Sequence, residues 1–318
     1  MIDKSNVSPL ISVVICTFNR SNLLIQVLTT LVCQTISFDK YEIIIVDNNS
    51  NDATRDLSSF FISDHPHISI RYILEPNQGL SYARNRGWKE AKGEYVAYVD
   101  DDCEVPNEWL KKAEEIIERM QPVAFGGPYY PFYSSPKPIW FKDEYGSHVQ
   151  GSESRNLHEG EYLDGANLFI RRDILKLLGG FNLDLGMSGE KIAYGEETAL
   201  LVNIRRKIPG AIIFYEPDLY IFHLVSERKM ILSWNLKNSF ISGLYAHHAL
   251  NSDKNDELAV LKRLLYGIFL IVILYYNVTI GSIYRDHEKY PYVQNYFYEH
   301  CFKHIAEIGV SFGYFRKK

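Results

Sequence analysis

The sequence predicts an α/β fold in which a doubly wound, mostly parallel sheet carries helices on both faces. In the first hundred residues, apolar runs alternate with segments whose apolar residues recur at helical spacing. This alternation with short loops is typical of parallel sheets. The chain has 318 residues, of which 46% are hydrophobic and 23% charged, so it is long enough for one large domain and an extension.

The predicted strands are continuous apolar runs, as expected of strands buried on both faces. They cover residues 10–17, 41–46, 68–74 and 94–99. Helical patterns follow at Leu24 to Leu31, from about Ala53, up to Ala91 and from about Asn107. Because crossovers between parallel strands are right-handed, these helices are expected to cover both faces of the sheet.

Each predicted strand ends in polar residues, and the fourth ends in Asp100, Asp101 and Asp102. Ligands of open α/β sheets bind at this edge. Three adjacent carboxylates repel one another in a cleft, so we expect a cation there. Oxygen ligands suit Mg²⁺ or Mn²⁺, which commonly bridge carboxylates to substrate phosphates. The alternative is a solvated acidic turn that caps the next helix.

Several classes of protein are disfavoured. A net charge of -5 argues against broad nucleic-acid binding. No G-x-G-x-x-G follows the first strand and no P-loop motif occurs, which disfavours dinucleotide-binding dehydrogenases and P-loop NTPases. The widely spaced Cys16, Cys33, Cys103 and Cys301 are expected to be free thiols in a reducing compartment. The N-terminus lacks a signal-type apolar core, so we expect the first half to stay in the cytosol.

Ordered motifs resemble those of family 2 glycosyltransferases, which have the GT-A fold. They are ISVVICTFNR at 11–20, EIIIVDNNS at 42–50, NQGLSYARNRG at 77–87, AKGEYVAYVDDD at 91–102, GANLFIRR at 165–172, GGFN at 179–182 and GEET at 195–198. The resemblance implies an inverting, metal-dependent transferase that moves a sugar from a nucleotide-diphosphate sugar, expected to be a UDP-sugar, to a hydroxyl of a glycan or lipid-linked acceptor. Two alternatives stay open, a sugar nucleotidyltransferase and an inactive nucleotide- or glycan-binding module.

The resemblance also implies roles for individual residues. Those expected to bind the nucleotide are Thr17, Asn19, Arg20, Asp47, Arg84 and Asp100. Among them, Asp47 would hold the base and Asp100 the ribose. Asp102 would hold Mn²⁺ or Mg²⁺ between the phosphates, acting as Lewis acid and template. His223 would be a metal ligand or a diphosphate contact.

The catalytic base implied by the resemblance is Glu197, with Glu196 as the second candidate. The family usually has Asp at this position, and the extra methylene of Glu shifts the carboxylate enough to matter. Carboxylates in a first helical turn are also stabilised by the macrodipole alone. Asp164 is a candidate donor-sugar or acceptor contact, and Arg228 is a candidate partner for phosphate oxygens.

Trp140 belongs to an aromatic segment at 126–140, which we expect to be a long loop. Such a loop is either a lid or acceptor platform, or a surface loop packed by its own side chains. The sequence does not decide between these two interpretations.

Residues 264–284 contain no charge and are flanked by Lys262, Arg263 and Arg285. This segment is a candidate membrane span, a helix in the membrane interface or a buried helix. We expect attachment to the membrane, helped by basic residues, including those at 316–318, that suit anionic lipid. The expected organisation is a catalytic domain at 1–250, with a nucleotide half at 8–127 and an acceptor half at 128–250. A helical, membrane-associated region at 251–318 would hold the enzyme at the cytoplasmic face of the cell membrane.

Overall fold

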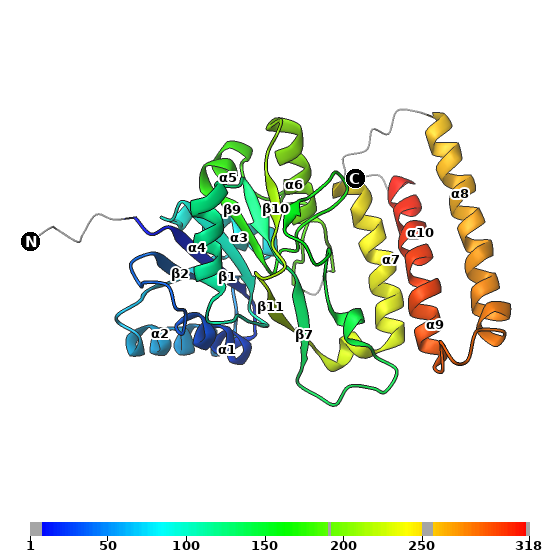
Figure 1. The fold of residues 1–318 in the computed structure, drawn as a ribbon, viewed down its shortest axis with the longest axis horizontal. Helices are drawn as coiled ribbons and strands as arrows, with labels where there is room; N and C mark the ends of the chain where they lie inside the picture. The colour runs from blue at the N-terminus through cyan, green and yellow to red at the C-terminus, as the bar shows by residue number, and fades with distance from the viewer. Residues whose placement is uncertain (1–7, 190–191, 250–256, 316–318) are drawn as a thin grey trace, which may run out of the picture.

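The computed structural model describes residues 8–189, 192–249 and 257–315. An eight-stranded sheet with the order β3-β2-β1-β4-β9-β6-β10-β8 forms the centre of the molecule, and a three-stranded sheet with the order β5-β11-β7 lies beside it (Figure 1). The strands are β1 (Ile11–Thr17), β2 (Tyr41–Asp47), β3 (Ser69–Leu74), β4 (Tyr95–Asp100), β5 (Cys103–Glu104), β6 (Ala124–Gly126), β7 (Tyr129–Tyr133), β8 (Arg155–Asn156), β9 (Leu168–Arg171), β10 (Ile213–Tyr215) and β11 (Ile221–Val225).

The four helices that the sequence predicts in the first 120 residues follow their strands in the expected order. In the catalytic part they are α1 (Ser21–Leu31), α2 (Thr54–Asp64), α3 (Leu80–Glu90), α4 (Trp109–Met120), α5 (Arg172–Leu178) and α6 (Glu196–Lys207). The short turns are η2 (Asp143–Gly146) and η3 (Glu227–Met230). The C-terminal part contains α7 (Leu232–Ala249), α8 (Glu257–Tyr276), η4 (Asn277–Gly281), α9 (Val293–His300) and α10 (Phe302–Phe315).

The parallel strands β1 to β4 confirm the predicted doubly wound sheet. Their register places Thr17 opposite Asp47, and Cys16 opposite Asp100. The ends of β1, β2 and β4 therefore meet at one edge of the sheet. Strand β9 is antiparallel to both β4 and β6, so the sheet is mixed beyond its first four strands.

Two apolar layers hold helices on opposite faces of this sheet. On one face, Val13 and Ile15 of β1 pack with residues of α1 and α4. On the other face, Val14 packs with residues of α3, α5 and α6. Alternate residues of a strand point to opposite faces, and both faces here are covered, which explains why β1 reads as an unbroken apolar run.

The expected aromatic loop at 126–140 is partly wrong, because its first part is strand. Residues 124–126 form β6, and β7 pairs in parallel with β11, placing Tyr129 opposite Ile221. Aromatic residues favour strands. Strand β7 lies at the edge of its sheet, where Pro131 is tolerated because no inner partner needs its missing N–H.

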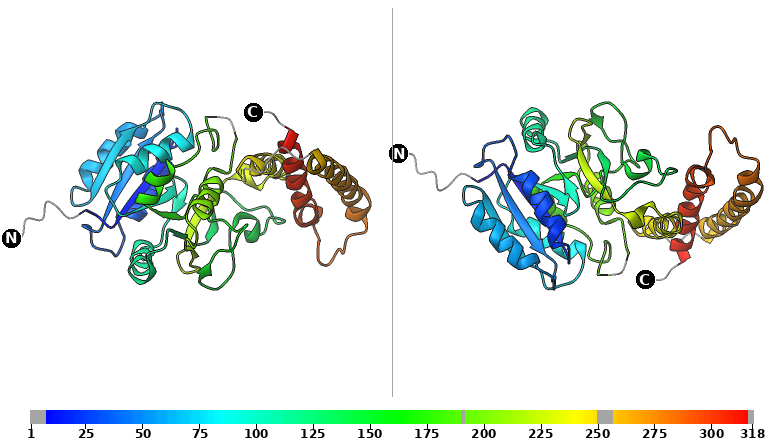
Figure 2. Two further views of the ribbon diagram at one scale, coloured as in Figure 1. Left: turned by 90° about the horizontal axis from the view of Figure 1, so that it is seen from above. Right: turned by 90° about the horizontal axis from the view of Figure 1, so that it is seen from below.

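The C-terminal helices stand side by side next to the catalytic part, and α8 is the outermost (Figures 1 and 2). The expected domain boundary at 250–251 and the basic residues at 316–318 lie outside the described residues. Within the described ranges, no helix combines the length and apolar character needed to cross a membrane.

Helix α9 contacts the irregular segment that follows β7. The ring of Tyr298 stacks on Tyr145 with centroids 3.7 Å apart, and its hydroxyl donates to the Tyr145 carbonyl at 2.9 Å. Asn295 Nδ2 donates to the Trp140 carbonyl at 2.5 Å, and Lys142 pairs with Glu299 at 2.9 Å. The C-terminal helices are thus fastened to the chain between β7 and β8.

Candidate active site

Asp101 joins the end of β4 to the end of β1. Its Oδ2 accepts a hydrogen bond from Thr17 Oγ1 at 2.8 Å, and its Oδ1 lies 2.9 Å from Arg20 Nη1. Burial raises the pKa of Asp101 to about 7; Arg20 opposes this shift and the charge of Asp102 adds to it. The sequence interpretation gave Asp101 no role, although it is the middle member of the triple carboxylate.

A cavity of about 170 Å³ opens at the ends of β1 and β4, on the side of α3. Thr17, Arg20 and Asp100, all expected to bind the nucleotide, lie on its wall. Asn19 does not line it: its Oδ1 accepts from the Asn51 backbone N–H at 2.8 Å. Three of the six residues expected to bind the nucleotide therefore line one cavity.

Asp47 lies behind this wall, because its side chain is only 2% exposed. Its carboxylate accepts from the Ser50 N–H at 2.9 Å and from the Tyr72 hydroxyl at 2.6 Å. The neighbouring Asn48 lines the cavity instead, and its amide group bonds to the backbone of the loop before α3, including the Gly79 N–H at 2.7 Å. The assignment of Asp47 to the base stays a prediction, and base recognition by this side chain would require its present bonds to rearrange.

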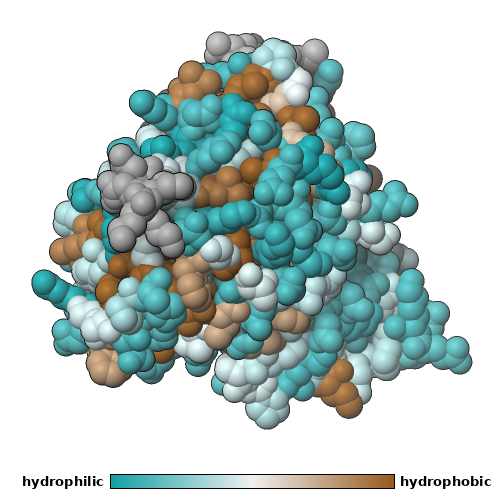
Figure 3. Space-filling view, turned by 60° about the vertical axis from the view of Figure 1, so that its left-hand side comes forward, coloured by the Kyte–Doolittle hydropathy of each residue, from teal (hydrophilic) through white to brown (hydrophobic). Residues whose placement is uncertain are grey.

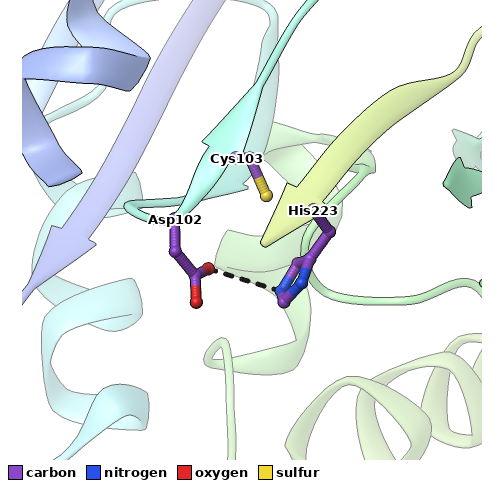
Figure 4. A group of neighbouring side chains, drawn as sticks. All are labelled: Asp102, Cys103 and His223. Carbon is purple, nitrogen blue, oxygen red and sulfur yellow. Dashed lines mark ion pairs between the residues drawn. The ribbon is translucent and has the colours of Figure 1, made fainter. Parts of the chain in front are cut away.

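Asp102, Cys103 and His223 bring their side chains together beside β11 (Figure 4). Asp102 Oδ1 lies 3.3 Å from His223 Nε2, and Asp100 Oδ2 lies 3.9 Å from the same nitrogen. Strand pairing explains the proximity, since His223 stands opposite Cys103 in the β5–β11 ladder.

The donor set suits a hard divalent cation. Burial opposes ionisation of Asp100, but the nearby His223 and the charge of Arg84 lower its pKa overall. Burial raises the pKa of the Cys103 thiol well above its usual value, so the thiolate that binds soft metals is disfavoured. Burial disfavours charge on His223 as well, yet the neighbouring carboxylates of Asp100 and Asp102 raise its pKa. Carboxylate oxygens and one imidazole fit Mn²⁺ or Mg²⁺ better than a thiolate-binding metal.

Lys229, which the sequence interpretation missed, is the cation beyond β11 that approaches the carboxylates. Its Nζ lies 3.8 Å from Asp102 Oδ2. The predicted Arg228 instead places its guanidinium over the Trp234 ring, 5.8 Å from the centroid. The sequence shows two adjacent basic residues after a strand, Arg228 and Lys229. The geometry of η3 determines which of them faces the carboxylates.

Arg84 connects the carboxylates of two different elements, and its side chain is only 4% exposed. Nη1 lies 2.8 Å from Glu196 Oε1 and 3.8 Å from Glu197 Oε2, while Nη2 lies 3.5 Å from Asp100 Oδ1. Gly165 makes room for it, because a Cβ there would stand 2.4 Å from Nη2. A buried guanidinium surrounded by carboxylates holds them in fixed relative positions.

Glu197 differs from its neighbour in what it faces. Helix α6 begins after Gly195, whose φ of 94° is a left-handed conformation. Glu196 is buried against Arg84, whereas the side chain of Glu197 is 21% exposed and lines a second cavity of about 380 Å³ together with Asp164. Burial, followed by the charge of Glu196, raises the pKa of Glu197 well above its usual value. This carboxylate is therefore a stronger base than an ordinary glutamate.

Trp140 packs away from both cavities. Its ring lies 5.4 Å from Phe141 and 6.4 Å from Tyr145, measured between centroids. The described walls of the two cavities do not include it. This placement does not support an acceptor-platform role for Trp140, because its segment packs against Val225 and Met230 and against α9.

Comparison with known proteins decides the family. The sequence profile described as glycosyl transferase family 2 matches residues 12–178. The chain belongs to glycosyl transferase family 2. This family 2 enzyme is 26% identical over 269 residues to a glucosyl-dolichyl phosphate glucuronosyltransferase of Haloferax volcanii, covering 80% of this chain and 83% of the relative. It is 28% identical over 251 residues to the succinoglycan biosynthesis protein ExoM of Rhizobium meliloti, covering 77% and 76%.

Solved structures confirm the GT-A fold of this family 2 chain. A mannosyltransferase of Pyrobaculum calidifontis in complex with GDP-Man and Mn²⁺ superposes with a TM-score of 0.59 at 18% identity, covering 95% of this chain and 88% of the other. TarS of S. aureus in complex with UDP-GlcNAc gives a TM-score of 0.55 at 18% identity, covering 90% and 78%. The expected family and fold are confirmed.

Proposed function

We propose that this family 2 glycosyltransferase moves a sugar from a UDP-sugar to a hydroxyl group of a growing glycan, with inversion at the anomeric carbon. The observation that carries the proposal is the position of Arg84. Its guanidinium contacts Asp100 on the donor side and Glu196 and Glu197 on the acceptor side. The nucleotide cavity and the base are thereby parts of one site.

The donor side supplies positive charge and cation ligands for a diphosphate. Arg20 and Lys229 both lie near Asp102, at 3.4 Å and 3.8 Å. Asp102, with His223 and Asp100 beside it, would hold Mn²⁺ or Mg²⁺, which supplies Lewis-acid stabilisation of the departing diphosphate. Support for a nucleotide-sugar donor comes from the similar solved structures, which hold GDP-Man, UDP or UDP-GlcNAc.

Glu197 acts as general base on the acceptor side. It takes the proton of the acceptor hydroxyl while that oxygen forms a bond to the anomeric carbon. The bond from this carbon to the diphosphate oxygen breaks, and its electron pair leaves with the nucleoside diphosphate. A base needs only hydrogen-bond reach to the hydroxyl, so no covalent intermediate with the enzyme forms. Asp164 shares the cavity wall with Glu197 and would orient the acceptor.

The acceptor is a glycan or a lipid-linked sugar of polysaccharide or glycoconjugate synthesis. This assignment draws on the names of the relatives, one of which acts on glucosyl-dolichyl phosphate while another serves succinoglycan biosynthesis. With a lipid-linked acceptor, the enzyme would work at the cytoplasmic face of the membrane. Residues 8–127 would then form the donor half and 128–250 the acceptor half, and the region at 251–318 would associate with the membrane.

Product analysis of Glu197→Gln tests the proposal. The native enzyme, incubated with a UDP-sugar, Mn²⁺ and an acceptor, should release UDP rather than the pyrophosphate of a nucleotidyltransferase. The variant should lose turnover by a factor of roughly 10² to 10⁴ and bind UDP with nearly unchanged affinity. Pyrophosphate release, or full turnover by the variant, would contradict the mechanism. A biological function that survives in the variant would instead indicate a binding module.

A further inference from the structure

Exposed apolar side chains of the described residues are concentrated on one helix and the turn after it. Twelve of the twenty-three large apolar residues that are exposed lie between 265 and 284. They are Leu265, Tyr266, Ile268, Phe269, Ile271, Val272, Tyr275, Tyr276, Val278, Ile280, Ile283 and Tyr284. Contiguous apolar surface of this kind marks an interaction site on a globular domain.

The exposed residues of α8 occupy more than half of its circumference. At 100° per residue they run from Ile271 through Val272 and Phe269 to Tyr266, an arc of about 220°. The buried stripe contains Gly267 and Leu270, with Gly267 next to Ser311 of α10. A single partner helix needs a stripe of roughly 100°. An arc twice as wide suits a surrounding medium better than one packed helix.

The position of α8 leaves most of this arc exposed; at its edge, the Tyr266 hydroxyl donates to Glu307 Oε2 of α10 at 2.7 Å. Helices α7 and α10 stand between α8 and the catalytic sheet (Figures 1 and 2). The side of the molecule in Figure 3 differs, because hydrophilic residues cover much of it and separate its hydrophobic patches. More than half of the large apolar residues that are exposed, among those described, lie on α8 and the residues that follow it.

The charges at the start of the arc suit an anionic bilayer. No charged residue occurs at 264–284, and Lys262 and Arg263 are exposed at its start. Basic residues at the border of an apolar helix are attracted to anionic head groups. Tyr266, Tyr275 and Tyr284 place amphipathic rings along the segment, as is typical of the boundary between acyl chains and water.

We propose that residues 265–284 form a docking surface for anionic lipid, on which α8 lies in the plane of the membrane interface. Apolar side chains enter the acyl boundary while Lys262 and Arg263 stay among the head groups, as in interfacial helices. The proposal does not depend on sugar transfer, since lipid binding is measured without substrate. It gives the membrane association of the C-terminal region a defined surface.

Vesicle flotation of the full chain tests this surface. The probes are vesicles of phosphatidylcholine alone and vesicles that also contain about 30% phosphatidylglycerol, which is anionic. The variant Phe269→Glu/Val272→Glu puts two charges into the centre of the arc. Its matched control is Phe60→Glu/Leu177→Glu, which charges two residues of similar exposure, 70% and 65%, outside α8.

The native chain and the control should float with the anionic vesicles, and the α8 variant should stay at the bottom with at least about a tenfold loss of affinity. Lys262→Glu/Arg263→Glu should weaken binding by roughly 30-fold or more, since each basic residue contributes about a factor of five. This second variant changes only exposed polar positions and keeps the test valid if the first one unfolds.

Two results would overturn the proposal. One is native protein that fails to float with anionic vesicles. The other is a dimer in lipid-free solution that becomes monomeric in Phe269→Glu/Val272→Glu while neither the native chain nor any variant floats, because the arc would then bind a second copy of the chain. Light scattering coupled to gel filtration measures the oligomeric state.

Discussion

Replacing Glu196 by Gln should extend the activity of the enzyme to lower pH. The base Glu197 works only when it has lost its proton, and its pKa is raised by burial and by the charge of Glu196. Activity of the native enzyme should therefore fall as the pH drops through this raised pKa. Gln keeps the shape of Glu196 and removes its charge, so it lowers the pKa of Glu197. Arg84, 3.8 Å from Glu197, then stabilises the remaining carboxylate more strongly.

Glu196 and Glu197 both lie within 4 Å of Arg84 Nη1, so their charges are a few ångströms apart. A unit charge at roughly 4 to 7 Å contributes about 2 to 4 kcal/mol at an effective dielectric constant of 20. Glu197 is 21% exposed, so water reduces this value by a factor of about two. At about 1.4 kcal/mol per pKa unit, the acid limb of the profile should move down by about 1 pH unit.

The assay measures kcat/KM for UDP release as a function of pH, from about pH 5 to about pH 9. Glu196→Asp is the control, because it keeps the charge and should leave the acid limb near its native position. If Glu196→Gln stays active while its acid limb does not move, Glu197 is not the group that titrates. An acid limb that moves to higher pH would contradict the electrostatic argument itself.

Three further outcomes are expected. Asp102→Ala should abolish the strengthening of UDP binding by Mn²⁺ in titration calorimetry, as chelation of the metal does in the native chain; unchanged titrations would exclude Asp102 as a ligand. Gly87→Ala should lower the free energy of unfolding by about 1–3 kcal/mol, because its methyl would stand 2.3 Å from Val14 Cγ1. The double variant with Val14→Ala should lose less stability than the sum of the losses in the two single variants. Additive losses, measured by chemical denaturation, would argue against the contact. Tyr298→Phe should lower the free energy of unfolding by about 1 kcal/mol, because the bond to Tyr145 is lost. Tyr298→Ala should lower it further, since the ring contact is lost as well. If both variants melt at the temperature of the native chain, Tyr298 contributes no stability.

Buried strands and the order of the motifs were predictable because they are local properties of the sequence. The run from Ile11 to Thr17 and the carboxylates after β4 needed no partner to be recognised. Which member of a cluster faces the ligand depends instead on turn geometry. Turn geometry thus directs Asp101 toward Thr17 and brings Lys229, next to the predicted Arg228, close to Asp102.

Contacts between distant segments were not predictable from one sequence. The pairing of β7 with β11 turns part of the expected aromatic loop into an edge strand. The hydrogen bond from Asn295 to the carbonyl of Trp140 joins residues 155 positions apart. Neither contact can be recognised from the local sequence, because the surface that each segment packs against determines whether it forms a strand or docks as a helix.

The attachment of α9 to the segment at 140–145 matters to anyone who builds chimaeras from this chain. Tyr298 stacks on Tyr145, Asn295 bonds to the Trp140 carbonyl and to the Tyr145 hydroxyl, and Glu299 pairs with Lys142. A C-terminal region transplanted from a relative would meet a foreign surface there unless residues 140–145 travelled with it. The exchangeable unit is therefore discontinuous in sequence, and a cut placed only near residue 250 would separate two pieces that fit each other.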